Sequence, residues 1–207
     1  MKRENNYLLN RFNKHIYNNL QVYILLIIIF LIGLALGIVA INNSDESSKE
    51  KIITYIESFA HRVQTENIEI QTCLWQSIKR NVIIILILLL LGYTIIGGPV
   101  ICLLVLFKGY SLSYSISAIF TSLNWRESIL LAILIALPYL LYIPSIFIAS
   151  ASGINVYKKL INNRREEPLK FCIIRHAIVC MIMLLVMIAA SILESYLFIW
   201  IKSLMIK

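Results

Sequence analysis

The sequence predicts an all-α polytopic membrane protein, with five transmembrane helices and a short extracytoplasmic amphipathic segment. Three observations lead to this fold class: the apolar composition, the long stretches without charge, and the placement of the basic residues. Of the 207 residues, 59% are apolar and only 14% are charged, and the mean hydropathy is +0.81. Soluble globular domains are nearer a quarter charged, so the composition excludes that class.

The net charge of +8 is concentrated in two places, the residues before the first apolar stretch and the segment 154–170. Positive charge beside membrane spans is more often an orientation signal than a nucleic-acid surface, and we expect no nucleic-acid partner. Five spans place both basic segments on the same side of the membrane, whereas four would separate them. The positive-inside rule therefore favours five spans with a cytoplasmic N-terminus. Lys79 and Arg80 are exceptions, because this topology places them outside.

The expected order of segments follows from the apolar runs and the polar stretches between them. The first run is longer than the apolar core of 7–15 residues found in a signal peptide, so we interpret it as an uncleaved span. The segments are a basic cytoplasmic tail (1–19), a first span (20–41), an extracytoplasmic amphipathic segment (42–81), a second span (82–107), a third span (108–124), a fourth span (128–153), a basic cytoplasmic loop (154–170), and a fifth span with an extracytoplasmic end (171–207).

The stretch 82–107 has no charged residue and would form a helix of roughly 39 Å, longer than a bilayer core requires. It contains Gly97, Gly98 and Pro99, and two layouts fit it. In the one we prefer, the second span continues through these residues with a kink and turns near Lys108. In the other, the turn is at 97–99, which places Lys108 about 13 Å into the bilayer by helix rise and is costly unless the side chain snorkels.

Small residues and prolines recur inside the predicted spans. Gly33 and Gly37 form a GxxxG pair in the first span, and small residues four apart on the third span allow neighbouring helices to approach closely. Two prolines should kink the fourth span. The residues predicted to pack helices or kink them are Gly33, Gly37, Gly97, Gly98, Pro99, Gly109, Ser113, Ser117, Pro138 and Pro144.

The segment 42–81 contains apolar residues at helical spacing: Ile52, Ile56, Phe59 and Val63. So short a segment cannot bury much core of its own. Two interpretations remain open: a helix lying on the membrane surface, or a helix whose apolar face docks a partner protein. In the second, these four residues are the docking face.

The sequence gives little support for a catalytic or metal-binding site. None of the HExxH, GxSxG, P-loop or GxGxxG motifs is present, and the four cysteines form no CxxC pair. His15, His61 and His176 are scattered and are interpreted as interface or surface residues. We therefore expect no enzyme activity, cofactor, metal or small-molecule substrate.

Glu194 is the one acid that falls within a predicted span, near the outer end of the fifth. An intramembrane acid is a functional hypothesis by default. The alternative is that it reaches interfacial water, or bonds a serine or tyrosine of a neighbouring span. The sequence indicates no basic or acidic partner for it, which makes it a poor proton relay.

Four stretches together resemble the stage II sporulation protein M family of endospore-forming bacteria. They are IGLALGIVAINN at the end of the first span, GYTIIGGPVICLLVLFKGYSLSY, the double-proline stretch ALPYLLYIPSIFIASASGI, and the closing SILESYLFIWIKSLM. Their order, their spacing and the total length match the family, and the likeness covers nearly the whole chain.

The resemblance implies a multi-pass protein of the cell membrane, at the septal or engulfing membrane during sporulation. It implies a scaffold in contact with membrane lipid, which gathers two peptidoglycan-degrading partners, stage II sporulation proteins P and D. A transporter or permease subunit is the alternative, because helices interrupted by Gly and Pro often line substrate sites.

Overall fold

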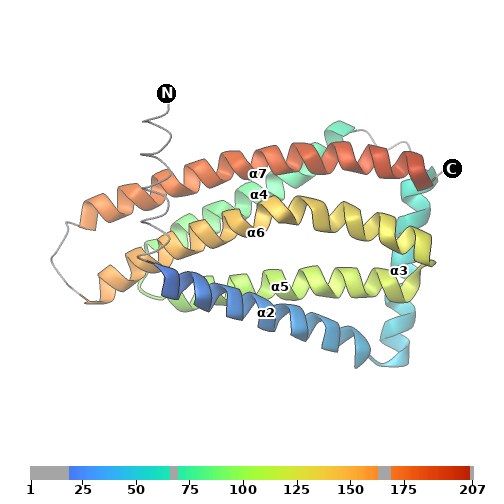
Figure 1. Ribbon diagram of the computed structural model, residues 1–207, viewed down its shortest axis with the longest axis horizontal. Coiled ribbons are helices and arrows are strands. Elements are labelled where there is room, and N and C mark those ends of the chain that lie inside the picture. The colour runs from blue at the N-terminus through green and yellow to red at the C-terminus, as the bar shows by residue number, and fades with distance from the viewer. Residues whose placement is uncertain (1–18, 66–69, 163–168, 206–207) are drawn as a thin grey trace.

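The computed structural model describes residues 19–65, 70–162 and 169–205, and in these ranges the chain is helical apart from short turns. Five helices are long and apolar enough to cross a membrane, which confirms the predicted fold class. They run alongside one another, and the sixth lies across one end of the bundle (Figure 1). The spans are α2 (Leu20–Asn42), α4 (Ile70–Gly92), α5 (Gly97–Ser122), α6 (Trp125–Asn162) and α7 (Leu169–Met205), and the crossing helix is α3 (Glu46–Thr65).

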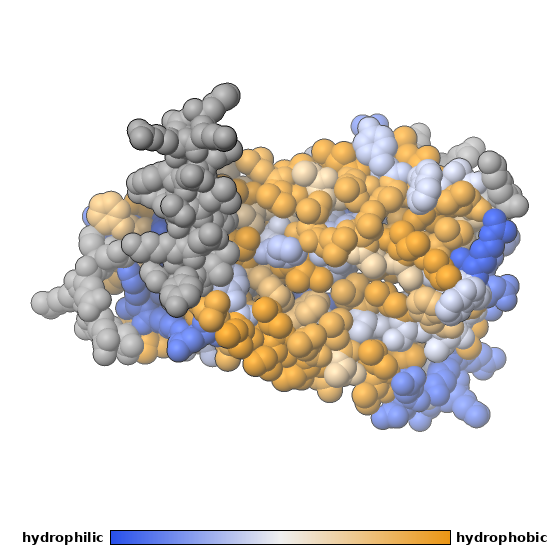
Figure 2. All heavy atoms as spheres, viewed as in Figure 1, coloured by the Kyte–Doolittle hydropathy of each residue, from blue (hydrophilic) through white to orange (hydrophobic). Residues whose placement is uncertain are grey.

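The spans are apolar on their outer faces as well as at their contacts. On α2, a buried stripe that includes Leu26 and Gly33 alternates with exposed Ile24, Ile28 and Leu31. Figure 2 shows the result on one face of the molecule: a broad hydrophobic band with hydrophilic residues gathered at its two ends. A helix that is hydrophobic all round requires an apolar surrounding, which the bilayer provides.

The turn between α4 and α5 corrects the preferred layout of the second and third spans. α4 ends at Gly92 and α5 begins at Gly97, so 82–107 is not one kinked span. A Cβ at Gly97 would collide with the carbonyl of Leu91, so only glycine fits this tight turn. Pro99 then falls in the first turn of α5, where its missing N–H leaves no hydrogen bond unmade.

The bounds of the other spans also differ from expectation. α5 ends at Ser122 after taking in Lys108 at mid-helix, and α6 extends from Trp125 to Asn162, beyond the expected 128–153. Pro138 and Pro144 both lie inside α6, which continues through them as one helix and is bent near its middle (Figure 1).

The two ends of the bundle differ. α3 crosses the end where α2 and α5 finish and α6 begins, and α7 finishes there as well (Figure 1). α2 begins, α6 ends and α7 begins toward the opposite end. The described residues next to both basic segments therefore share one end, because four spans, an even number, lie between the two segments.

Glycines bring α2 and α5 into backbone contact. A Cβ on Gly33 would collide with the carbonyl of Leu106, and one on Gly109 with the carbonyl of Phe30. Ser113 lies against Gly37 in the same interface, whereas Ser117 is half-buried further along α5. Van der Waals contact of this kind drives helix association in lipid, where the hydrophobic effect between helices is absent.

We expect Gly33→Leu to destabilise the protein, because the new side chain must push α5 away from α2. Overpacking of this kind costs about 1–3 kcal/mol, which thermal unfolding of the full chain in detergent would measure. Ala35→Leu is the matched control, because Ala35 lies on the exposed face of the same helix. Equal unfolding temperatures for the two variants would contradict the close α2–α5 contact.

Candidate functional site

Glu194 on α7 is held by side chains from two other helices. Its Oε2 accepts hydrogen bonds from Ser77 Oγ at 2.6 Å and from the Tyr142 hydroxyl at 2.7 Å. Arg80 Nη2 forms an ion pair with Oε1 at 2.9 Å. Ser77 and Arg80 belong to α4 and Tyr142 to α6, so this one carboxylate joins three spans.

A second set of hydrogen bonds continues from the carboxylate into the bundle. Asn81 Nδ2 donates to Ser191 Oγ at 2.8 Å, and Ser191 Oγ donates to the Met187 carbonyl at 3.0 Å. The Tyr142 hydroxyl lies 3.5 Å from Ser191 Oγ. Asn81 and Ser191 are buried. We call these residues the polar cluster: Ser77, Arg80, Asn81, Tyr142, Ser191 and Glu194.

Helical spacing explains why these side chains meet. Ser77, Arg80 and Asn81 are three and four residues apart on α4, so they share one face. Ser191 and Glu194 are three apart on α7 and share the face of that helix that meets α4. Burying a charge is costly unless it is paired and hydrogen-bonded, and here the carboxylate has both kinds of partner. The arrangement therefore satisfies the carboxylate within the protein and ties α4, α6 and α7 together.

The expectation that Glu194 has no basic partner is wrong, because Arg80 supplies one. The alternative, a bond to a serine or tyrosine of a neighbouring span, is what the structure shows. A usable signal was present in the five-span topology, which places Arg80 near the outer start of one span and Glu194 near the outer end of another. The two are far apart in sequence, so local pattern reading missed the pair.

A cavity of about 450 Å³ lies between the polar cluster and α3. Arg80, Ser77 and Glu194 line one side of it, and the rest of its wall is largely apolar, with Phe59 from α3, Ile135 from α6 and Phe198 from α7. The polar cluster is therefore next to a space that α3 partly encloses.

The apolar face of α3 packs on the protein's own bundle. Val63 is fully buried at 0% exposed, and Ala60 packs with Ile119 and Leu131 in a small core that Ile56 also contacts. Ile52 is half-buried, and Phe59, at 37% exposed, is the most accessible of the four residues predicted to dock a partner. The structure thus corrects that prediction: this face already covers the ends of α5 and α6.

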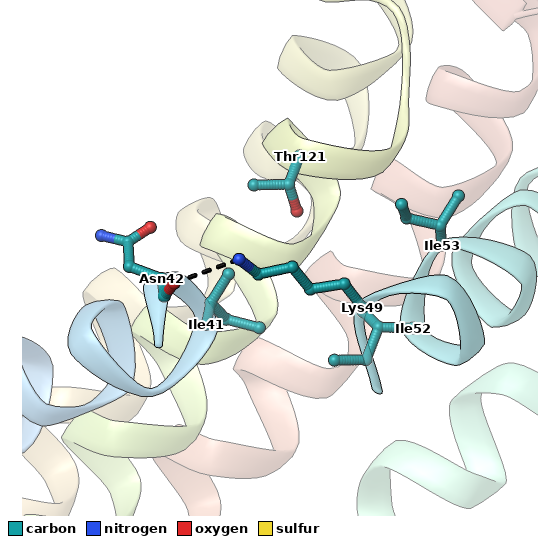
Figure 3. A pocket seen from close by; sticks show the side chains of 6 residues that line it. All are labelled: Ile41, Asn42, Lys49, Ile52, Ile53 and Thr121. Atoms are coloured by element: carbon teal, nitrogen blue, oxygen red, sulfur yellow. Dashed lines mark hydrogen bonds between the residues drawn. The ribbon is translucent and has the colours of Figure 1, made fainter. Parts of the chain in front are cut away.

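The start of α3 is fastened to the end of α2. Lys49 Nζ donates to the Asn42 carbonyl at 3.1 Å, beside a pocket of about 220 Å³ that Ile41, Ile52 and Ile53 help to line (Figure 3). The last carbonyls of a helix lack intrahelical donors and carry partial negative charge, so a lysine there is favourable. This contact adds a polar link between α2 and the start of α3.

His176 corrects another expectation, that the histidines are surface or interface residues. It is fully buried on α7, and its Nε2 lies 3.4 Å from the Leu88 carbonyl. A Cβ on Gly92 would collide with the imidazole, so the space left by this glycine accommodates the ring. His61 is exposed on α3, and His15 lies outside the described residues.

Comparison with known proteins gives one match. The family model described as Stage II sporulation protein M matches residues 25–197, a range that includes all five spans at least in part and the whole polar cluster. No curated protein and no solved structure matches the chain.

We expect Tyr142→Phe to lower the free energy of unfolding by about 1 kcal/mol, because Glu194 loses one of its donors. Tyr196→Phe is the control, since Tyr196 is exposed on the same helix as Glu194 and should have little effect. A double-mutant cycle with Glu194→Gln should show a coupling of about 0.6 kcal/mol, and up to 1.7 kcal/mol. Unfolding of the full chain in mixed micelles measures both, and zero coupling would contradict the bond.

Proposed function

Because the chain belongs to the stage II sporulation protein M family, and is thus a sporulation membrane protein, we propose that it is a scaffold of the engulfment machinery. In this role it holds peptidoglycan-degrading partners, stage II sporulation proteins P and D, at the septal membrane. The N-terminus and the basic loop are cytoplasmic, and α3 lies on the wall side. The cleavage of peptidoglycan belongs to the partners.

The observation that carries this proposal is the position of α3 across one end of a braced bundle. Hydrogen bonds within the polar cluster join α4, α6 and α7. α3 is packed through Ala60 and Val63 on the end opposite the basic flanks. A rigid bundle that presents one fixed helix toward the wall suits a role in positioning other proteins.

The docking surface belongs on the outward face of α3, since the inward face is occupied. Tyr55, Ser58 and Arg62 recur at helical spacing on this face and are exposed. Ser58 Oγ donates to the Tyr55 carbonyl at 2.8 Å, and Arg62 Nε donates to the Ser58 carbonyl at 3.3 Å. Tyrosine and arginine are the residue types that most often dominate binding energy at protein interfaces.

The structure removes the two observations that favoured a transporter. The Gly-Gly-Pro sequence begins α5 after a complete turn, and α6 is helical through both of its prolines. Neither stretch is an unwound segment of the kind that lines transporter sites. The run interrupted at 97–99 is the turn of a helical hairpin, and the run with two prolines is one bent helix.

Paired substitutions on the outer face of α3 test the docking surface. We expect Tyr55→Ala with Arg62→Glu to reduce recovery of both hydrolases with the tagged protein about tenfold or more, since loss of an interface hot spot costs 2 kcal/mol or more. Pull-down from sporulating cells, normalised to the amount of scaffold in the membrane, gives the measurement.

Arg126→Glu is the matched control, because Arg126 is exposed at the same end of the molecule but on α6. It should leave recovery unchanged. Full recovery with the α3 variant would place the contact elsewhere, and equal loss with the control would show that charge at this end matters rather than the α3 surface.

The cellular role is tested by deletion. Cells without the protein should arrest with a flat or bulging septum, visible with a membrane dye, because peptidoglycan is not thinned ahead of the advancing membrane. Normal forespore uptake in the deletion strain would refute the proposed role.

A further inference from the structure

The outward face of α4 carries a polar shelf above an apolar stripe, and we propose that it binds an anionic glycerophospholipid of the outer leaflet. The leaflet follows from the orientation given under the proposed function; the binding itself does not depend on it. The shelf consists of Trp75 and Lys79, with Gln76 and Arg80 at its edge, where these two also line the cavity beside the polar cluster; all four are exposed. The stripe continues the same face with exposed Ile83, Leu86 and Leu90.

The shelf has the chemistry of the headgroup layer. Lys79 Nζ lies 5.5 Å from the centre of the Trp75 ring, a cation–π distance that holds the ammonium at a fixed place on the helix. Tryptophan with basic side chains is typical of the boundary between hydrocarbon and headgroups. Lys79 therefore lies where a lipid phosphate would be.

The apolar stripe runs in the direction that the chains of such a lipid would take. α4 passes from the α3 end of the bundle toward the opposite end (Figure 1), so Ile83, Leu86 and Leu90 lie deeper than the shelf. They extend over roughly 10 Å of helix. A headgroup on the shelf would thus lay its acyl chains along exposed apolar side chains of the same helix.

Within the described residues, the shelf carries two cations, Lys79 and Arg80, and is contacted by one acid, Glu194. Arg80 donates to Ser77 and to both oxygens of Glu194 through Nη2, and its side chain is 55% exposed. A guanidinium carries five N–H donors, so Nε and Nη1 can bind a further acceptor such as a phosphate oxygen. Among the described residues, Glu194 pairs with Arg80, whereas the recorded contact of Lys79 is the Trp75 ring.

A bound anionic lipid would account for the two basic residues, Lys79 and Arg80, that the positive-inside rule does not expect on the outer side. Basic residues on the outer side oppose the usual orientation signal, but a phosphate with net negative charge would neutralise the surplus. A zwitterionic headgroup brings no net charge and leaves the surplus in place. The proposed ligand is therefore an anionic lipid such as phosphatidylglycerol, not phosphatidylcholine.

The test uses the purified full chain in neutral detergent, with bound lipid measured by native mass spectrometry. The probes are phosphatidylglycerol, phosphatidylcholine with the same acyl chains, and glycerol phosphate as a headgroup without chains. We expect wild type to bind phosphatidylglycerol at least about fivefold more tightly than phosphatidylcholine, as one basic side chain near a membrane surface contributes about that factor. Lys79→Gln should remove most of that preference.

Lys51→Gln is the control, because it removes one exposed positive charge from α3, away from the shelf, and should leave the preference unchanged. Thermal unfolding of all variants without added lipid shows that the fold is retained. Equal affinity for the two lipids, equal loss with Lys51→Gln, or competition by glycerol phosphate as effective as that by phosphatidylglycerol would each overturn the proposal. None of these outcomes bears on hydrolase recruitment.

Discussion

The structure depends on one constraint, that a charge placed between membrane helices must find its partners within the protein. Where packed helices exclude water, a charge without partners is costly, and the Glu194 side chain is only 25% exposed. Glu194 meets the constraint with Ser77, Arg80 and Tyr142. Because these donors come from α4 and α6, satisfying the acid also sets how α4, α6 and α7 pack.

A different kind of contact attaches α2 and α5. Glycines on both helices allow backbone atoms to touch, and no ionised group takes part in the contacts around Gly33, Gly37 and Gly109. The bundle thus combines two devices that operate in lipid, close packing of small residues on one side and hydrogen bonding of polar residues on the other. α3 then covers the end of both parts through Ala60 and Val63.

The fold class could be predicted from the sequence because it rests on composition and on charge placement, which need no knowledge of tertiary contacts. The turn at Gly97 does not follow from the sequence alone, because the cost of placing Lys108 inside a span depends on the neighbouring helices that half-bury it. The same limit applies to the polar cluster. Ser77 and Arg80 read locally as a polar stretch before a span, and only tertiary packing brings them to Glu194.

The apolar face of α3 shows why an amphipathic pattern alone does not identify a binding surface. The pattern predicts that one face of the helix is buried, and in this protein it is buried against the end of the protein's own bundle.

The connections of α3 determine how it would carry a mechanical load. The chain joins α3 to α2 at one end and to α4 at the other, and Lys49 adds a tie to Asn42. In the scaffold role proposed above, a pull on α3 by bound proteins would divide between two membrane-spanning helices, α2 and α4.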